Sequence, residues 1–216
     1  MITVNQNGNF MITDPMLVRV IWILVLWLTG VLLLGNTGML NDSELMPLVF
    51  GVTVILPPLL AWLAWRSFVS VRAFVSGIDV RILILLHSFR TVGFGFLILY
   101  AHDMLHPLFA FPAAIGDIAT AFAALTLGIL LFKGIDLPTN AVRRWNTFGL
   151  IDFAIAVIAG ITMRSALLGS ENLNTDLMGS FPLMIFPTFL VPMMIIVHLM
   201  IYAKLSQQNH LTGARL

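Results

Sequence analysis

The stretch ILILLHSFRTVGFGFLILY, residues 82–100, decides the fold of this chain. It is long enough to cross a bilayer as one helix, because a span needs roughly 20 mainly apolar residues. It nevertheless carries His87 and Arg90 three positions apart, which places both side chains on one helical face. A charge at the bilayer centre costs about 2.5–3.5 kcal/mol, so such residues usually face the bundle interior and have a partner. The stretch therefore predicts a membrane helix with a polar site on its inner face.

The composition of the whole chain agrees with this interpretation. Of the 216 residues, 59% are hydrophobic and 10% are charged, with a mean hydropathy of +1.00, which is far outside the soluble range. We predict an all-α integral membrane protein of the cell membrane, with one multi-pass domain over residues 1–216 and the lipid bilayer as its surroundings. The absence of cysteine excludes disulfides and thiolate metal sites. Because no clustered basic face appears, nucleic acid is not expected as a partner.

Six segments reach or approach the length of a span, and they lie near residues 18–35, 46–65, 82–101, 108–132, 145–163 and 181–203. Cytoplasmic loops carry an excess of lysine and arginine, which gives the orientation. With both termini in the cytoplasm, the outer loops hold only Arg164, and the cytoplasmic side holds Arg19, Arg66, Arg72, Arg81, Lys133, Arg143, Arg144, Lys204 and Arg215. We therefore predict a six-transmembrane-helix bundle with both termini cytoplasmic.

Five ionisable residues within the predicted spans form the candidate ligand-binding site: His87, Arg90, Asp117, Asp152 and His198. His87 and His198 each lie six residues from the nearest cytoplasmic basic residue. At 1.5 Å per residue, both histidines are expected about 9 Å inside the membrane, at one level. Neutral imidazoles at one depth suit proton, metal or haem chemistry, although polar packing is an equal alternative.

Arg90 is expected to pair with a carboxylate. By the same helical rise, Asp152 lies about 12 Å and Arg90 about 14 Å from the cytoplasmic side, whereas Asp117 lies about 24 Å away. Asp152 is therefore the nearer predicted partner and Asp117 the second. An Arg–Asp pair of this kind either serves a binding site or simply locks helices together.

Residues Gly116, Thr120, Ala124 and Gly128 form a row of small side chains at steps of four. Such a row allows helices to pack closely. It predicts either a seam inside the bundle or the face of a homodimer. A second packing signal is the spacing of Asn146, Gly149 and Asp152 at steps of three, which also predicts a close approach between helices.

The last predicted span contains Pro182, Pro187 and Pro192 at steps of five. Each proline frees a backbone carbonyl on the preceding turn, so this helix is expected to be bent or locally unwound. It is either a bent packing helix or a discontinuous helix that borders a binding cavity.

The string HDMLH, residues 102–106, places His102 and His106 four positions apart in an outer loop. Two histidines on one helical face are candidate ligands of a divalent metal, but a third ligand is not nearby in the sequence. The alternative is a polar interfacial loop. His87 and His198 are the other metal candidates.

Four functions are compatible with these residues. The leading one is small-solute or proton-coupled transport, in which the buried residues serve a proton-coupled or an anion pathway and Arg90 holds an acidic group. The first alternative is a redox protein with a b-type haem between His87 and His198. A metal-dependent intramembrane enzyme and a structural membrane subunit are the other two.

Overall fold

The structure, a computed structural model, describes residues 2–4, 10–12, 14–37, 40, 46–164 and 176–212. A short antiparallel hairpin of β1 (Ile2–Val4) and β2 (Phe10–Ile12) precedes the helices. The α-helices are α1 (Pro15–Asn36), α2 (Met46–Ser67), α3 (Val69–Gly77), α4 (Val80–Leu86), α5 (Phe94–Ala101), α6 (Pro107–Phe132), α7 (Thr139–Arg164) and α8 (Val191–Thr212). Two 3-10 helices, η1 (His87–Gly93) and η3 (Asp176–Gly179), and one π-helix, η4 (Phe186–Leu190), complete the described elements. The predicted helical class is confirmed, and the hairpin is an addition that the sequence analysis missed.

Many large apolar side chains are exposed on the outside of the helices, and several polar and ionisable side chains are buried within the apolar core. Large exposed apolar residues include Leu26, Ile55, Phe89, Ile115 and Ile158. Buried polar residues include His87, Arg90, Asn146, Asp152 and His198. An apolar surface of this kind is unfavourable in water, but it matches lipid tails, which are as apolar as leucine.

Five helical segments in the described part of the chain are long and apolar enough to cross a membrane. They are Pro15–Asn36, Leu48–Ser67, Val80–Ala101, Pro107–Phe132 and Phe186–Gln207. The chain is therefore a multi-pass membrane protein, as predicted. The segment predicted at 145–163 corresponds to α7, which packs against α6 and α8 but is not among these five. The count of six spans and the cytoplasmic side of the termini stay predictions.

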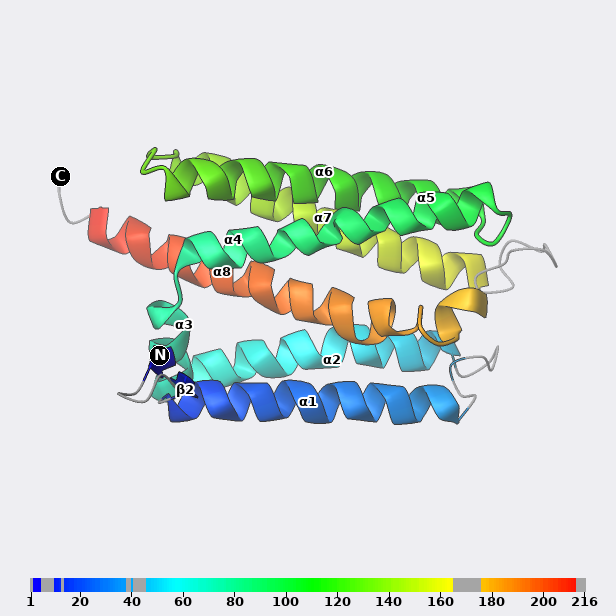
Figure 1. The fold of residues 1–216 in the computed structure, drawn as a ribbon, viewed down its shortest axis with the longest axis horizontal. Helices are drawn as coiled ribbons and strands as arrows, with labels where there is room; N and C mark the ends of the chain where they lie inside the picture. The colour runs from blue at the N-terminus through cyan, green and yellow to red at the C-terminus, as the bar shows by residue number, and fades with distance from the viewer. Residues whose placement is uncertain are drawn as a thin grey trace.

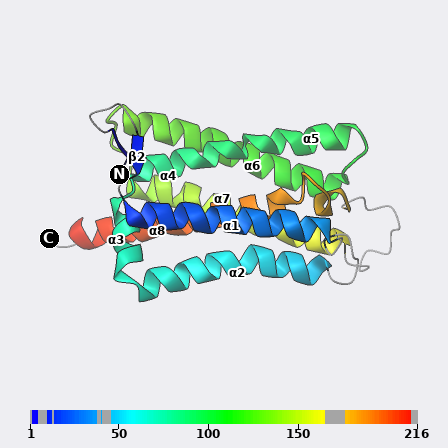
Figure 2. The same ribbon diagram turned by 60° about the horizontal axis from the view of Figure 1, so that its bottom comes forward.

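The long helices lie lengthwise beside one another, with β2 and the C-terminal end of α8 at the same end of the bundle (Figure 1). Helix α6 packs against α4, η1, α5 and α7, and α8 packs against α2, α4 and α7. Helices α1 and α2 lie on one side of α8, with α6 and the α4–α5 segment on the other (Figure 1), and the turned view keeps α2 opposite α6 and the α4–α5 segment (Figure 2). Helix α8 thus connects the two layers.

Two differences from the predicted segments have local causes. Helical structure in the last segment begins at Phe186, not at residue 181, because a turn around Pro182 precedes the π-helix.

The stretch predicted as a cytoplasmic loop after α2 contains α3, a helix of 9 residues that is too short to span. Lys204 of α8 donates from Nζ to the carbonyl oxygens of Val75 (3.3 Å) and Ser76 (2.8 Å) at the C-terminal end of α3. A cation there satisfies free carbonyls and interacts favourably with the helix dipole.

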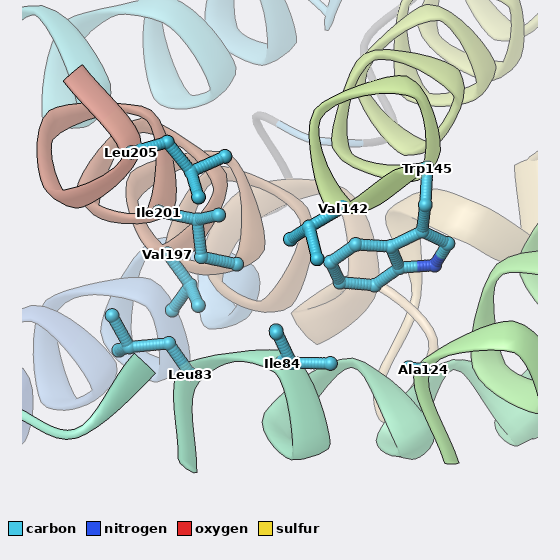
Figure 3. Packing of buried hydrophobic residues seen from close by; sticks show 8 residues of the cluster. All are labelled: Leu83, Ile84, Ala124, Val142, Trp145, Val197, Ile201 and Leu205. Carbon is cyan, nitrogen blue, oxygen red and sulfur yellow. The ribbon is translucent and has the colours of Figure 1, made fainter. Parts of the chain in front are cut away.

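Two apolar clusters lie at different levels of the bundle. The Trp145 cluster comprises Leu83, Ile84, Ala124, Val142, Trp145, Val197, Ile201 and Leu205, and Figure 3 shows these side chains converging from four helices. The Phe109 cluster comprises Phe96, Leu105, Phe109, Ala110, Ala113, Ala114 and Met178. Along α6, Asp117 and Thr120 fall between Ala114 of one cluster and Ala124 of the other, and along the α4–η1–α5 segment His87 and Arg90 fall between Ile84 and Phe96. The polar site is therefore a layer between two apolar ones.

Candidate functional site

The third long helix changes its winding within the motif quoted above. Helix α4 ends at Leu86, the 3-10 helix η1 follows, and α5 resumes at Phe94. A 3-10 helix has three residues per turn, so residues three apart lie directly above one another. His87, Arg90 and Gly93 therefore form one line along η1, and all three are buried. A 3-10 stretch within a long helix often marks a functional hinge.

Arg90 is 3% exposed, and its guanidinium is surrounded by acceptors. Its Nε donates to Asp117 Oδ1 at 2.6 Å, and its Nη2 donates to Asp152 Oδ2. Its Nη1 donates to the carbonyl oxygen of Gly149 at 3.2 Å and lies 3.3 Å from His198 Nε2. Both carboxylates named as partners from the sequence thus contact the same guanidinium, one from α6 and one from α7.

The face of the guanidinium is also covered. The Cζ atom of Arg90 lies 3.7 Å from the centroid of the Phe153 ring. A cation over an aromatic face is attracted by the ring quadrupole, more strongly when water is absent. Polar groups at the edge and an aromatic ring on the face together hold Arg90 in one position.

The charges of this cluster do not cancel. One guanidinium faces two carboxylates, so the cluster of Arg90, Asp117 and Asp152 carries a net charge of −1 when both aspartates are ionised. An unbalanced charge in a low-dielectric interior costs several kcal/mol. One additional positive charge, either a proton or a bound cation, would neutralise the cluster. This charge requirement is the chemically distinctive property of the site.

The hydrogen bonds of Asn146 determine the tautomer of His198. Asn146 Nδ2 donates to the backbone carbonyl of His198 at 3.1 Å, so its Oδ1 is the atom that faces the ring, 2.7 Å from His198 Nδ1. An amide oxygen only accepts, so Nδ1 carries the hydrogen and Nε2 presents a lone pair. That lone pair accepts from Arg90 Nη1. His198 is therefore neutral and extends the hydrogen-bond network of the arginine to α8.

His87 is held by ring packing. Its imidazole stacks on that of His198 with centroids 3.8 Å apart and planes 24° apart, and it meets the edge of Trp145 at 5.4 Å. The two histidines that were predicted to lie at one level are thus in contact within the bundle. Neither ring nitrogen of His87 has a hydrogen-bond partner among the described residues, although the side chain is fully buried. His87 is the least satisfied polar group of the site.

Three glycines allow the helices to approach at this level. A Cβ atom at Gly116 would overlap the carboxylate of Asp152, and one at Gly93 would lie 2.7 Å from the Cβ of Asp117. A Cβ at Gly149 would lie 2.6 Å from His198 Cε1. Real Cβ atoms do not come so close to other heavy atoms, so each carboxylate reaches Arg90 past a glycine.

The row of small residues on α6 lies inside the protein. Gly116, Thr120, Ala124 and Gly128 are all buried, and a Cβ at Gly128 would overlap Leu85 of α4. The row is therefore the close-packing seam that was the first of its two interpretations. A homodimer stays a prediction, and this row is covered by the chain itself.

A haem coordinated by His87 and His198 does not fit this arrangement. Axial ligands lie on opposite faces of the macrocycle and each gives one ring nitrogen to the iron. Here the two imidazoles are in direct contact, and both nitrogens of His198 already have protein partners. The expectation of an axial pair is therefore not supported.

The HDMLH string forms the turn between α5 and α6. His106 caps α6 by accepting from Leu108 N–H at 3.3 Å through Nδ1, and Asp103 adopts the left-handed conformation with φ of 56°. Within the ranges that the structure describes, no three His, Cys, Asp or Glu side chains are grouped as metal ligands. His102 and His106 thus form part of a polar turn, as the alternative interpretation predicted.

A cavity of about 90 Å³ adjoins the cluster. Its walls come from α2, α5, α6, α7, η3, η4 and α8, and Asp117 is the one ionisable residue among the described side chains that line it. Along α6 the lining residues are Phe109, Ala113 and Asp117, so Asp117 lies deepest toward the middle of the helix. Phe153 lines the same end of the cavity from α7. The Arg90 cluster therefore adjoins the end of the cavity that Asp117 and Phe153 line.

The structure brings together all five residues that the sequence analysis selected. It adds four residues: Asn146, which orients His198; Phe153, which covers Arg90; and Gly93 and Gly149, which admit close contacts. The three-residue spacing of Asn146, Gly149 and Asp152 already indicated a close approach. Nothing in the sequence distinguished Phe153 from the other apolar residues of its helix.

The fold and the site define a polytopic helical membrane protein with a charged cluster buried in its bundle. The chain belongs to the family described as Domain of unknown function (DUF8737), whose model matches residues 47–206. That range contains all five selected residues and leaves out the hairpin and α1. No curated protein and no solved structure matches the chain.

Proposed function

We propose that this protein is a transporter that moves a small solute across the membrane and couples this movement to a proton bound at the Arg90 cluster. The observation that carries the proposal is the sharing of one guanidinium by two buried carboxylates, one of which lines a cavity. A site that needs one more positive charge binds a proton and releases it when another cation arrives or the geometry changes. Ionisable residues of this kind within spans mark proton relays and substrate pathways.

The depth of the cluster supports this function. Arg90 lies ten residues after the start of the span Val80–Ala101 and eleven before its end. At 1.5 Å per residue, that is about 15 Å from either side, near the bilayer midplane. Substrate and coupling-ion sites of secondary transporters lie at this depth, commonly beside discontinuous helices.

Two irregular helical segments border the site and supply such discontinuities. The 3-10 helix η1 carries Arg90, and the π-helix η4 contributes Phe186 and Pro187 to the cavity. Short 3-10 and π stretches are frequent at functional sites. A change of winding in η1 would move Arg90 relative to both carboxylates without breaking α4 or α5.

The competing function is purely structural. In that case the contacts of Arg90 would only hold the helices together. The two functions differ in what they predict for the carboxylates. If the cluster is structural, Asp117 and Asp152 are needed only for stability. If the protein is a transporter, the folded protein also needs both carboxylates to move protons. Asn at either position keeps an oxygen that accepts from Arg90, so it separates charge from hydrogen bonding.

The test uses purified protein in liposomes that contain a trapped pH-sensitive dye. Short amines, amino acids, monosaccharides and short carboxylic acids are added in turn to the outside. We expect one of these classes to drive proton movement in the wild type, with at least a tenfold loss in Asp117→Asn and in Asp152→Asn. The matched control is Asp103→Asn, because asparagine tolerates the left-handed conformation of that exposed turn position. Absence of proton movement with all four classes in folded wild-type protein would overturn the proposal.

A further inference from the structure

Resting on the proposed function, we infer that the cavity beside Asp117 binds a short primary amine as its ammonium ion, with the alkyl chain among the apolar walls. The chemistry of the cavity lining, the sign of the uncompensated charge and the size of the cavity support this class of ligand.

The surface of the cavity is almost entirely apolar, and Asp117 at one end is the one ionisable residue among the described side chains that line it. Phe96, Phe109, Val157 and Phe186 come from four different elements, and Asp117 is the one carboxylate. Ligand pockets typically combine a mainly apolar wall with a few polar groups that fix orientation. The arrangement therefore suits a molecule with an apolar body and a single polar head directed at Asp117.

The sign of the head follows from the hydrogen bonds of Arg90. Four of its five N–H hydrogens have protein partners, and Phe153 covers its face, so little of the guanidinium is left to bind an anionic ligand. An anion would also add to the surplus negative charge of the cluster. A cation at Asp117 instead completes the balance of two carboxylates with two positive charges. The aromatic rings of the lining favour a cation further.

The size of the cavity limits the ligand. A cavity of 150 Å³ is known to hold benzene, so the cavity of about 90 Å³ has room for a chain of about three or four carbons. An ammonium group on such a chain would reach Asp117 while the alkyl part contacts Phe109 and Val157, which also line the cavity. A longer chain would have to extend out of the cavity.

Binding of an ammonium ion to the protonated cluster releases one proton. The ammonium keeps its three hydrogens and pairs with the carboxylate of Asp117, and the proton that had neutralised the cluster leaves. The groups that face Asp117 from the packed elements are Arg90 of η1 and Asp152 of α7, with His198 of α8 behind Arg90. One positive charge therefore replaces another, which would make the coupling an exchange of amine for proton.

The experiment compares three probes with the same carbon chain, n-butylamine, 1-butanol and butanoate, by equilibrium binding to the protein in bilayers, with protein-free bilayers subtracted. We expect n-butylamine to bind at least tenfold more tightly than the other two, with release of one proton per amine. Asp117→Asn should lose this preference, and Ala156→Leu should weaken binding at least tenfold because Ala156 lines the cavity. Ala154→Leu, two residues away and exposed, should leave binding unchanged.

Equal binding of the three probes, or an amine preference that persists in Asp117→Asn, would overturn the inference. Tighter binding of butanoate would show an anion site instead. If amines fail while another solute class drives proton movement that depends on Asp117, the inference is wrong and the transport function stands. If n-butylamine binds as expected but no solute moves protons, the binding site stands and the transport function is wrong.

Discussion

The Trp145 cluster and the Phe109 cluster lie on opposite sides of the buried charges and differ in packing. In the Trp145 cluster, Ile84, Ala124 and Ile201 have no exposed surface. In the Phe109 cluster, Phe96, Phe109, Ala113 and Met178 border a cavity. Because Asp117 lines that cavity, the charged layer has free space on the side of the Phe109 cluster. On the side of the Trp145 cluster it meets closely packed residues. The comparison shows that the free space beside the charged layer lies on the Phe109 side.

The largest effect is expected at the layer between the two halves. Arg90→Ala would leave two buried carboxylates without their cation, and breaking a buried pair of this kind costs about 3–5 kcal/mol. In the Arg90→Ala background, Asp152→Asn should recover part of the loss, because it removes one unpaired charge. Thermal or denaturant unfolding of the four proteins in a double-mutant cycle measures the coupling. Additive losses would remove the pairing from this account.

The same substitution in each half tests the packing difference itself. Ala124→Leu adds three carbons where no exposed surface is left, and overpacking of this kind costs about 1–3 kcal/mol. Ala156→Leu adds the same atoms to the cavity wall, so its cost should be less than half as large. The free energy of unfolding in detergent or bilayers is the measurement. Equal costs at the two positions would mean that the cavity does not persist in the bilayer.

A pair of glycine substitutions tests the close approach that forms the charged layer. Gly116→Ala should destabilise the protein by about 1–3 kcal/mol, because its methyl group would occupy the place of the Asp152 carboxylate. Gly95→Ala has open space around its Cβ in α5, so the helical preference of alanine should stabilise it by about 0.5–1 kcal/mol. Opposite signs in unfolding measurements are expected. A neutral Gly116→Ala would show that α6 and α7 are further apart than described here.

The smallest effect is expected outside the membrane, at the start of α4. Asp79 caps α4, and its hydrogen bond to the Arg81 side chain lowers the pKa of the Asp79 carboxyl below the ordinary 3.8. A lowered folded-state pKa contributes stability that is present above the unfolded pKa and is lost as the pH falls through the folded value. Because this ion pair is partly exposed, we expect only a small contribution to the stability of the folded protein. The difference in melting temperature between wild type and Asp79→Asn should shrink at acid pH, and a difference independent of pH would contradict the ion pair.

The sequence predicted the parts of this molecule that depend on composition, length and helical spacing. The spans, the shared face of His87 and Arg90, and the pairing with Asp152 followed from the cost of polar groups in lipid. The rotation of each helix about its axis did not follow, since apolar residues surround every span on both the lipid and the protein side. For that reason Phe153 was missed and the two histidines suggested a haem.

The change of winding at η1 also escaped prediction. A 3-10 segment has no distinct residue pattern in a run that is apolar throughout, yet it aligns Arg90 with Gly93 and so brings Asp117 within reach. The depth estimate placed Asp117 about 10 Å from Arg90 along the membrane normal because it compared backbone positions at the helical rise. The length of the arginine side chain and the missing Cβ of Gly93 close that gap.

The most direct test of the account is the infrared carboxyl spectrum of the protein in bilayers at neutral pH. The wild type should show the band of one protonated, buried carboxyl, since one proton neutralises a guanidinium shared by two carboxylates. The band should vanish in Asp117→Asn and equally in Asp152→Asn, because each variant leaves Arg90 with one carboxylate and no surplus charge. A wild type without the band, or a band that persists in either variant, would contradict the central claim that the cluster holds an exchangeable proton.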